Sequence, residues 1–128
     1  MKKSTKKGRI IIPAGRKPWP HELRVAEILA ANGYRVEFLP ETNLKTADIL
    51  LDGVEYEIKS PRSSTPNSLE HLLKKSLKQS QNIIISLMRI NGMHSSVLRF
   101  LAIQAKTRKR LKKLLVVTKQ GRIIDISG

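Results

Sequence analysis

Two acidic side chains and one lysine on a predicted β-hairpin are the residues best placed to do chemistry. Residues 47–60 read ADILLDGVEYEIKS, and the central Asp52-Gly53 is the strongest short-range signal for a two-residue hairpin turn. That turn fixes a register in which Asp48 lies opposite Glu57. Because side chains alternate between the two faces of a strand, Lys59 shares the face of Glu57. We therefore expect Asp48, Glu57 and Lys59 to form one polar cluster.

Repulsion between the two carboxylates of this cluster suggests a bound cation. Directly opposed residues on a hairpin have β-carbons about 5 Å apart, where like charges destabilise the sheet. A divalent cation such as Mg²⁺, held by one or two carboxylates together with water and phosphate oxygens, would relieve the repulsion between Asp48 and Glu57. Lys59 could then hold a water molecule or stabilise charge on a phosphate. The alternative is a solvated strand face whose carboxylates are merely neutralised by nearby lysines.

The composition predicts a polyanionic partner. The chain has 128 residues, enough for one domain, and 25 Lys and Arg against 10 Asp and Glu give a formal charge of +15. Phosphate neutralisation makes nucleic acid the expected partner, rather than a membrane, since no long amphipathic helix with large apolar anchors is apparent. The chain has no Cys, which excludes disulfides and thiolate catalysis and suits a reducing cytoplasm. Three scattered His do not make a zinc site.

Hydrophobic periodicity predicts a single α/β domain over residues 18–128, preceded by a basic flexible arm over 1–17 with a short edge strand at 9–12. The residue before a predicted helix, Ser68, is a plausible cap. The run Ile83–Leu87 is continuously apolar, as expected for a strand buried on both faces. The expected elements are a helix at 20–31, a strand at 34–39, the hairpin, a helix from 68 to about 81, a strand at 83–87, a helix at 95–105 with a basic extension to 113, and a closing hairpin at 114–118 and 122–126.

The spacing of Asp48 and Glu57-Ile58-Lys59 resembles the D…(D/E)-x-K signature of the PD-(D/E)XK nuclease superfamily. The wider pattern is similar to the C-terminal tRNA-nuclease toxin domain of CdiA-type contact-dependent growth inhibition proteins. It extends over roughly residues 18–87 and includes His21-Glu22, Gly33-Tyr34-Arg35-Val36 and Lys78 to Ile84. The chain departs from the signature at Ala47, where the residue before the aspartate is usually proline. This position is a loose part of the signature.

The resemblance implies a fold, a cofactor and a set of site residues. The fold would be a single restriction-endonuclease-like αβββαβ domain with a mixed central sheet and a C-terminal helix-hairpin extension. Asp48 and Glu57, with Glu22, would bind Mg²⁺ or Mn²⁺, and Lys59 and Gln79 would complete the catalytic set. For Glu22 the sequence leaves two readings open, because a carboxylate in the first turn of a helix is also favourable to the helix dipole.

Further basic and polar residues are candidate substrate contacts. Ser60 and Arg62 lie in the Ser/Pro-rich loop after the hairpin, and Lys75 is four residues before Gln79 on the same predicted helix face. The densest positive run is a candidate rail for the phosphate backbone, although such runs are also common at solvated helix ends. The rail residues are Lys106, Arg108, Lys109 and Arg110.

We therefore predict a metal-dependent endonuclease that hydrolyses phosphodiester bonds, with tRNA the substrate that the resemblance implies. The resemblance also implies an acidic immunity protein as a partner and action in the cytoplasm, in the toxin's case that of a target cell after delivery in a larger effector. Two alternatives remain open. One is a DNA nuclease or resolvase of the same fold, and the other is a basic nucleic-acid-binding protein without catalytic activity.

Overall fold

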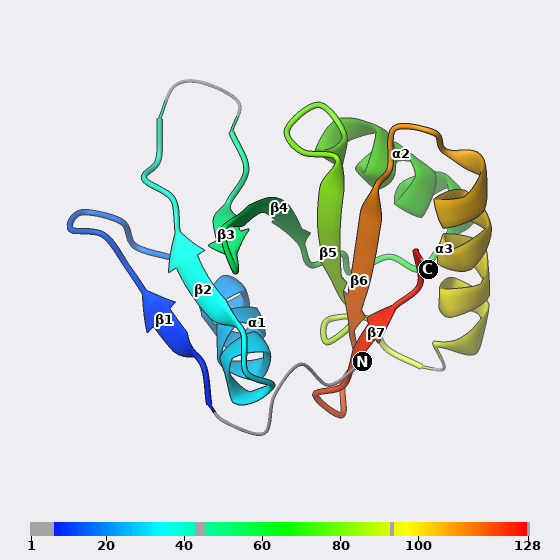
Figure 1. The fold of residues 1–128 in the computed structure, drawn as a ribbon. Helices are drawn as coiled ribbons and strands as arrows, with labels where there is room; N and C mark the ends of the chain where they lie inside the picture. Colours follow the sequence, from blue (N-terminus) through cyan, green and yellow to red (C-terminus); the bar gives the residue numbers. More distant parts are fainter. Residues whose placement is uncertain (1–6, 43–45, 93, 128) are drawn as a thin grey trace.

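Seven strands form one curled sheet whose spatial order follows the chain from β1 to β7 (Figure 1). The structure is a computed structural model, and it describes residues 7–42, 46–92 and 94–127. The strands are β1 (Arg9–Ile11), β2 (Arg35–Phe38), β3 (Ile49–Leu51), β4 (Val54–Lys59), β5 (Asn82–Ser86), β6 (Lys113–Val117) and β7 (Ile123–Asp125), and the helices are α1 (Pro20–Ala31), α2 (Pro66–Ser76) and α3 (Ser95–Thr107).

The sheet is mixed, as the family resemblance implies. Strands β2, β3 and β4 run antiparallel to their neighbours in this group, whereas β4, β5 and β6 are parallel to one another. The edge strand β1 is parallel to β2, and β7 closes the other edge antiparallel to β6. The predicted order of helices and strands and the C-terminal helix and hairpin are therefore confirmed.

Two hydrophobic cores lie on opposite faces of the sheet, and β5 shows this most clearly. Its residue Ile84 packs in the cluster that contains Val25 and Leu29 of α1. Its neighbours Ile83 and Ile85 pack in the other cluster, with the apolar faces of α2 and α3. The prediction that this strand is buried on both faces is confirmed, because all three isoleucines are fully buried.

The ends of α2 differ from the prediction. The helix begins at Pro66 and its cap is Thr65, whose side chain accepts a hydrogen bond from the backbone N–H of Ser68. Proline suits this first helical position because its φ is already helical and its missing N–H would have had no helical partner. The predicted cap at Ser68 is therefore wrong, and the helix ends at Ser76, before the expected Gln81.

The basic run after α3 also differs. The expected helical extension to Lys113 is wrong, because α3 ends at Thr107 and the next residue, Arg108, has an extended backbone. Lys113 begins β6 instead. The intervening residues 108–112 form a loop at the end of the sheet where α2 leads into β5 (Figure 1).

The segment expected as an arm makes backbone contacts with the rest of the domain from Gly8 onward. Residues 1–6 lie outside the described residues. The predicted edge strand is confirmed as β1, and Gly8 approaches the backbone of Tyr34 so closely that an added Cβ would lie 1.8 Å from its carbonyl oxygen. Arg16 is buried. Within the described ranges, no helix is long and apolar enough to cross a membrane.

Candidate active site

The hairpin of β3 and β4 positions the candidate site. Asp52 and Gly53 both have positive φ angles, 49° and 85°, as a type I′ turn requires. The observed pairs of Leu51 with Val54, Leu50 with Glu55 and Ile49 with Tyr56 confirm the predicted register. The following position in this register brings Asp48 to Glu57, at the end of the sheet where β3 begins.

Asp48 is fixed by hydrogen bonds on both sides of the hairpin. Its Oδ2 atom accepts a hydrogen bond of 2.8 Å from the backbone N–H of Ile58. Its backbone N–H donates to the carbonyl oxygen of Tyr56, at 3.1 Å, and its own carbonyl oxygen accepts from Leu39. The carboxylate therefore points to the face of β4 that carries Glu57.

Glu57 is a buried carboxyl beside a second carboxyl. The residue is only 2% exposed, and its Oε2 atom lies 3.1 Å from the Nζ atom of Lys59. Burial raises the pKa of Glu57 to about 8; a hydrogen bond with Asp48 and the negative charge of Asp48 act in the same direction, and Lys59 acts against them. Glu57 thus faces more unfavourable than favourable interactions as an anion.

Gln79 completes this cluster from the loop after α2. With its amide nitrogen directed at Glu57, the side chain donates hydrogen bonds to both carboxylate oxygens, the one to Oε1 at 2.9 Å. The structure therefore brings Asp48, Glu57, Lys59 and Gln79 together from three separate segments. These are four of the five residues predicted as catalytic, and their catalytic role stays a prediction.

Glu22 has other partners. Its Oε1 atom accepts a 2.8 Å hydrogen bond from the backbone N–H of Trp19, and its Oε2 atom lies 3.7 Å from Nη2 of Arg16. This is the helix-start arrangement that was one of the two readings, and it is confirmed. A role for Glu22 as a third metal ligand stays a prediction.

Arg16 is a residue of this site that the sequence did not single out. Its guanidinium lies 5.4 Å from the ring centroid of Phe38, and its Nε atom donates to the carbonyl oxygen of Leu39 at 3.0 Å. With Asp48 and Gln79 it lines an open pocket of about 250 Å³. Nothing in the spacing around Arg16 could have found it, because its contacts are made to β2 and α1.

Of the predicted substrate contacts, Lys75 lines a second pocket. This pocket, of about 210 Å³, is lined by Lys59, His71 and Lys75, with Ser68 and Leu72. The Ser60 hydroxyl is buried and has no hydrogen-bond partner among the described residues. Arg62 is exposed in the following loop. The sequence also missed Arg89, whose Nη1 atom lies 3.5 Å from the carbonyl oxygen of Ser60.

The predicted phosphate rail is divided between a helix and a loop. Lys106 lies in the last turn of α3, whereas Arg108, Lys109 and Arg110 follow the helix. Arg108 donates to the side chain of Gln104 at 2.7 Å. These positive side chains therefore do not form one helical face.

The donor set fits a divalent cation with incomplete protein coordination. Asp48 and Glu57 offer the oxygen ligands that Mg²⁺ prefers, and a cation would relieve their repulsion. In the part of the chain that the structure describes, no group of three or more His, Cys, Asp and Glu side chains could hold a metal ion. Water, backbone carbonyl or phosphate oxygens would therefore have to supply the remaining ligands.

Comparison with known proteins places the chain in a family. The model of the contact-dependent growth inhibition CdiA C-terminal domain family matches residues 45–123. A chain in the solved CdiA-CT/CdiI toxin and immunity complex from Burkholderia pseudomallei has the same fold, with a TM-score of 0.66 and 18% identity over 92% of this chain and 98% of that chain. No curated protein sequence matches. Since the family match covers more than half of the sequence and contains Asp48, Glu57, Lys59 and Gln79, the chain belongs to the contact-dependent growth inhibition CdiA C-terminal domain family.

Proposed function

We propose that this chain is a toxin domain that cleaves phosphodiester bonds of tRNA with the help of a divalent metal ion. The observation that carries the proposal is the buried Glu57 carboxyl, which Asp48, Lys59 and Gln79 surround. A carboxyl with a strongly raised pKa beside a pocket is typical of a functional site. The order α1, β2, β3, β4, α2, β5 also supports the restriction-endonuclease-like core.

Each residue has a role that follows from its position. Asp48 and Glu57 would hold Mg²⁺ or Mn²⁺, which when bound lowers the pKa of a water molecule and polarises the phosphate. The hydrogen bonds from Gln79 orient Glu57. Lys59, whose side chain is one-third exposed, can place its ammonium group beside a phosphate and offset the charge that develops during cleavage.

Cleavage of total tRNA and of plasmid DNA, each with Mg²⁺, Mn²⁺ or EDTA, tests this proposal. We expect cleavage of tRNA with either metal and none in EDTA. Glu57→Gln and Lys59→Ala should each lower the cleavage rate about 100-fold or more. Glu55→Gln is the matched control, because Glu55 is an exposed glutamate two residues away on the same face of β4.

The other outcomes identify the alternatives. Cleavage of DNA alone would favour a DNA nuclease or resolvase of the same fold. If neither nucleic acid is cut while both are bound with steep salt dependence, the chain is a binding module and the catalytic proposal fails. Equal activity of the unaltered chain and Glu57→Gln would also contradict it.

We further propose an acidic immunity protein as partner and the cytoplasm of a target cell, reached by delivery, as the place of action. The toxin and immunity complex that contains the structural neighbour supports such a partner. The charge of +15 favours an acidic surface on it. Such a protein should compete with tRNA for Glu57→Gln in a binding assay, and simultaneous binding of both would contradict coverage of the site.

A further inference from the structure

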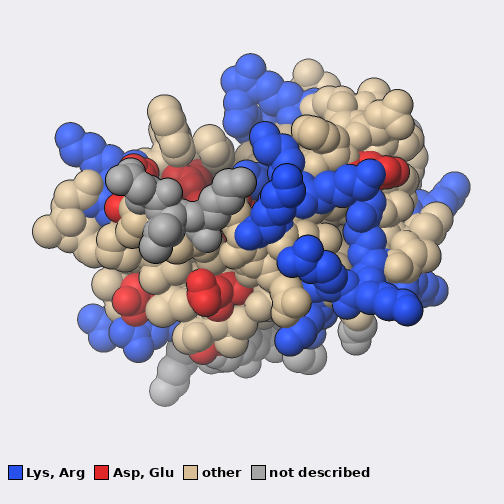
Figure 2. All heavy atoms as spheres, turned by 90° about the horizontal axis from the view of Figure 1, so that it is seen from above, with Lys and Arg blue, Asp and Glu red and all other residues tan. Residues whose placement is uncertain are grey.

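Positive side chains gather at the end of the molecule that carries the candidate active site. Figure 2 views this end and shows a band of Lys and Arg side chains over the half formed by α2, β5, β6 and α3. Most of the Asp and Glu atoms visible in this view lie over the other half. The face therefore has an uneven charge distribution that the net charge alone does not describe.

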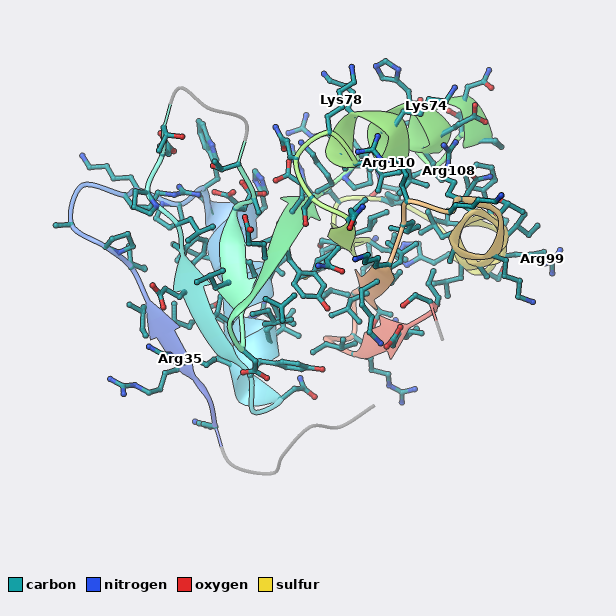
Figure 3. The ribbon with its side chains drawn as sticks, turned by 45° about the horizontal axis from the view of Figure 1, so that its top comes forward. Arg35, Lys74, Lys78, Arg99, Arg108 and Arg110 are labelled. Atoms are coloured by element: carbon teal, nitrogen blue, oxygen red, sulfur yellow. The ribbon has the colours of Figure 1, made fainter. Side chains whose placement is uncertain are left out.

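Two separate segments contribute four of these positive residues. Lys74 projects from α2 and Lys78 from the turn that follows this helix, whereas Arg108 and Arg110 come from the loop after α3; Figure 3 shows the four at the same end of the molecule. We call these four residues the basic strip. Arg110 joins the segments, because its Nη2 atom donates to the carbonyl oxygen of Leu77 at 3.3 Å.

The basic strip continues the positive charge of the candidate active site. Lys75 lies on α2 between the two lysines of the strip and shares the second pocket with Lys59. Lys59 in turn lies 3.1 Å from Glu57. A phosphate backbone that leaves the site through this pocket would therefore meet α2 and then the loop at 108–112.

The chemistry of the strip favours a double helix over a single strand. Proteins bind single strands largely by stacking bases on aromatic side chains, and they bind duplex RNA largely through phosphates and shape. The strip consists of Lys and Arg alone. The exposed Trp19 lies instead in a different pocket, with Gly15 and Glu41.

We propose that the basic strip binds the phosphate backbone of a double-helical stem in the substrate, away from the bond that is cleaved. This inference rests on the proposed function, because it assumes that the substrate is a folded nucleic acid. It assigns to Lys74, Lys78, Arg108 and Arg110 a preference for stems over unpaired strands.

The test measures binding without cleavage. In a Glu57→Gln background and in EDTA, affinities are measured for an RNA hairpin and for an unpaired oligouridine of equal length. Replacing Lys74 and Lys78 by Gln should weaken hairpin binding about tenfold and lower the slope of log K against log salt by roughly 2, because two phosphate contacts are lost. Oligouridine binding should change by less than about threefold.

The matched control removes the same charge from the opposite end of the molecule. Lys119 and Arg122 are exposed in the turn between β6 and β7, which lies at the bottom of Figure 1. Their replacement by Gln should leave hairpin binding within about twofold. Equal losses in the two double variants, or equal losses for hairpin and oligouridine, would overturn the proposal.

A second variant should strengthen binding, which misfolding cannot imitate. Glu70 lies 3.2 Å from the Nζ atom of Lys74 and offsets its charge. Glu70→Gln should tighten hairpin binding about threefold. Glu27→Gln is its control, since Glu27 forms a similar pair with Arg24 on α1, at 3.6 Å, and should have no effect. Because binding is read without cleavage, an inactive protein with these binding results would refute only the nuclease proposal.

Discussion

The negative charge of Glu57 is unfavourable in the folded chain. The protonation of Glu57 therefore makes the stability of the fold depend on pH. The buried carboxyl lies beside Asp48, and Lys59 offsets only part of the cost of its negative charge. Its pKa is about 8 in the folded chain, against 4.5 for an ordinary glutamate. Between these two pH values the folded chain therefore keeps a proton that the unfolded chain has released.

Stability without metal should fall as the pH rises through this window. Each unit of pKa difference corresponds to about 1.4 kcal/mol, so the loss begins above pH 4.5 and is complete above pH 8. Glu57→Gln cannot titrate, and the Tm difference, variant minus unaltered chain, should grow by roughly 15 °C between pH 5 and pH 8.5. Thermal unfolding in EDTA measures it, with Glu55→Gln as control. A pH-independent difference would contradict the assigned environment of Glu57.

Divalent cations should reverse this loss. At pH 8, addition of Mg²⁺ or Mn²⁺ to the unaltered chain should raise the Tm, because an ion bound only by the folded state stabilises it. In Glu57→Gln the gain should be reduced by more than half, and in Glu22→Gln it reports whether that residue is a third ligand. Equal gains in the unaltered chain and in Glu57→Gln would place the ion elsewhere.

The sequence predicted the residues of this cluster unequally. Asp48 and Glu57 could be paired because the Asp52-Gly53 turn determines the register from local chemistry. Gln79 came only from the family resemblance, since the loop after α2 has no periodicity. The burial of Glu57 and the contacts of Arg16 could not be predicted, because both depend on distant segments that pack around the hairpin.

At the scale of elements, the helices were predicted better in their middles than at their ends. The apolar positions of α1 and β5 followed from periodicity and burial. The start of α2 depended on a choice between two hydroxyl residues, Thr65 and Ser68, that periodicity does not distinguish. The end of α3 depended on Arg108 leaving the helical conformation to lead into β6.

The cap of α2 can be tested directly. Thr65→Ala should lower the free energy of unfolding by about 1 kcal/mol, because the backbone N–H of Ser68 loses its acceptor. Ser68→Ala should cost less than half as much, because that residue lies inside the helix. Urea denaturation of the two variants gives both values. A larger loss in Ser68→Ala would restore the cap predicted from the sequence.

At the scale of the whole molecule, positive charge and the candidate catalytic groups are concentrated at one end. The turn that leads from α2 into β5 and the loop at 108–112 lie at the end of the sheet where Asp48 and Glu57 meet (Figure 1). A uniform distribution of the charge of +15 would attract nucleic acid in any orientation. The observed distribution instead favours encounters in which the phosphate backbone approaches the candidate active site first.

Removal of the N-terminal lysines should weaken nucleic-acid binding without the hairpin preference that we assign to the basic strip. A chain that begins at Lys7 lacks Lys2, Lys3 and Lys6, and its nucleic-acid affinity should fall through charge alone. In the Glu57→Gln background in EDTA, the slope of log K against log salt should decrease by roughly 2 to 3, with similar losses for hairpin and oligouridine. The strip variant should differ by lowering hairpin affinity selectively. If truncation instead abolished the preference for hairpins, recognition of the stem would depend on residues 1–6 and not on α2.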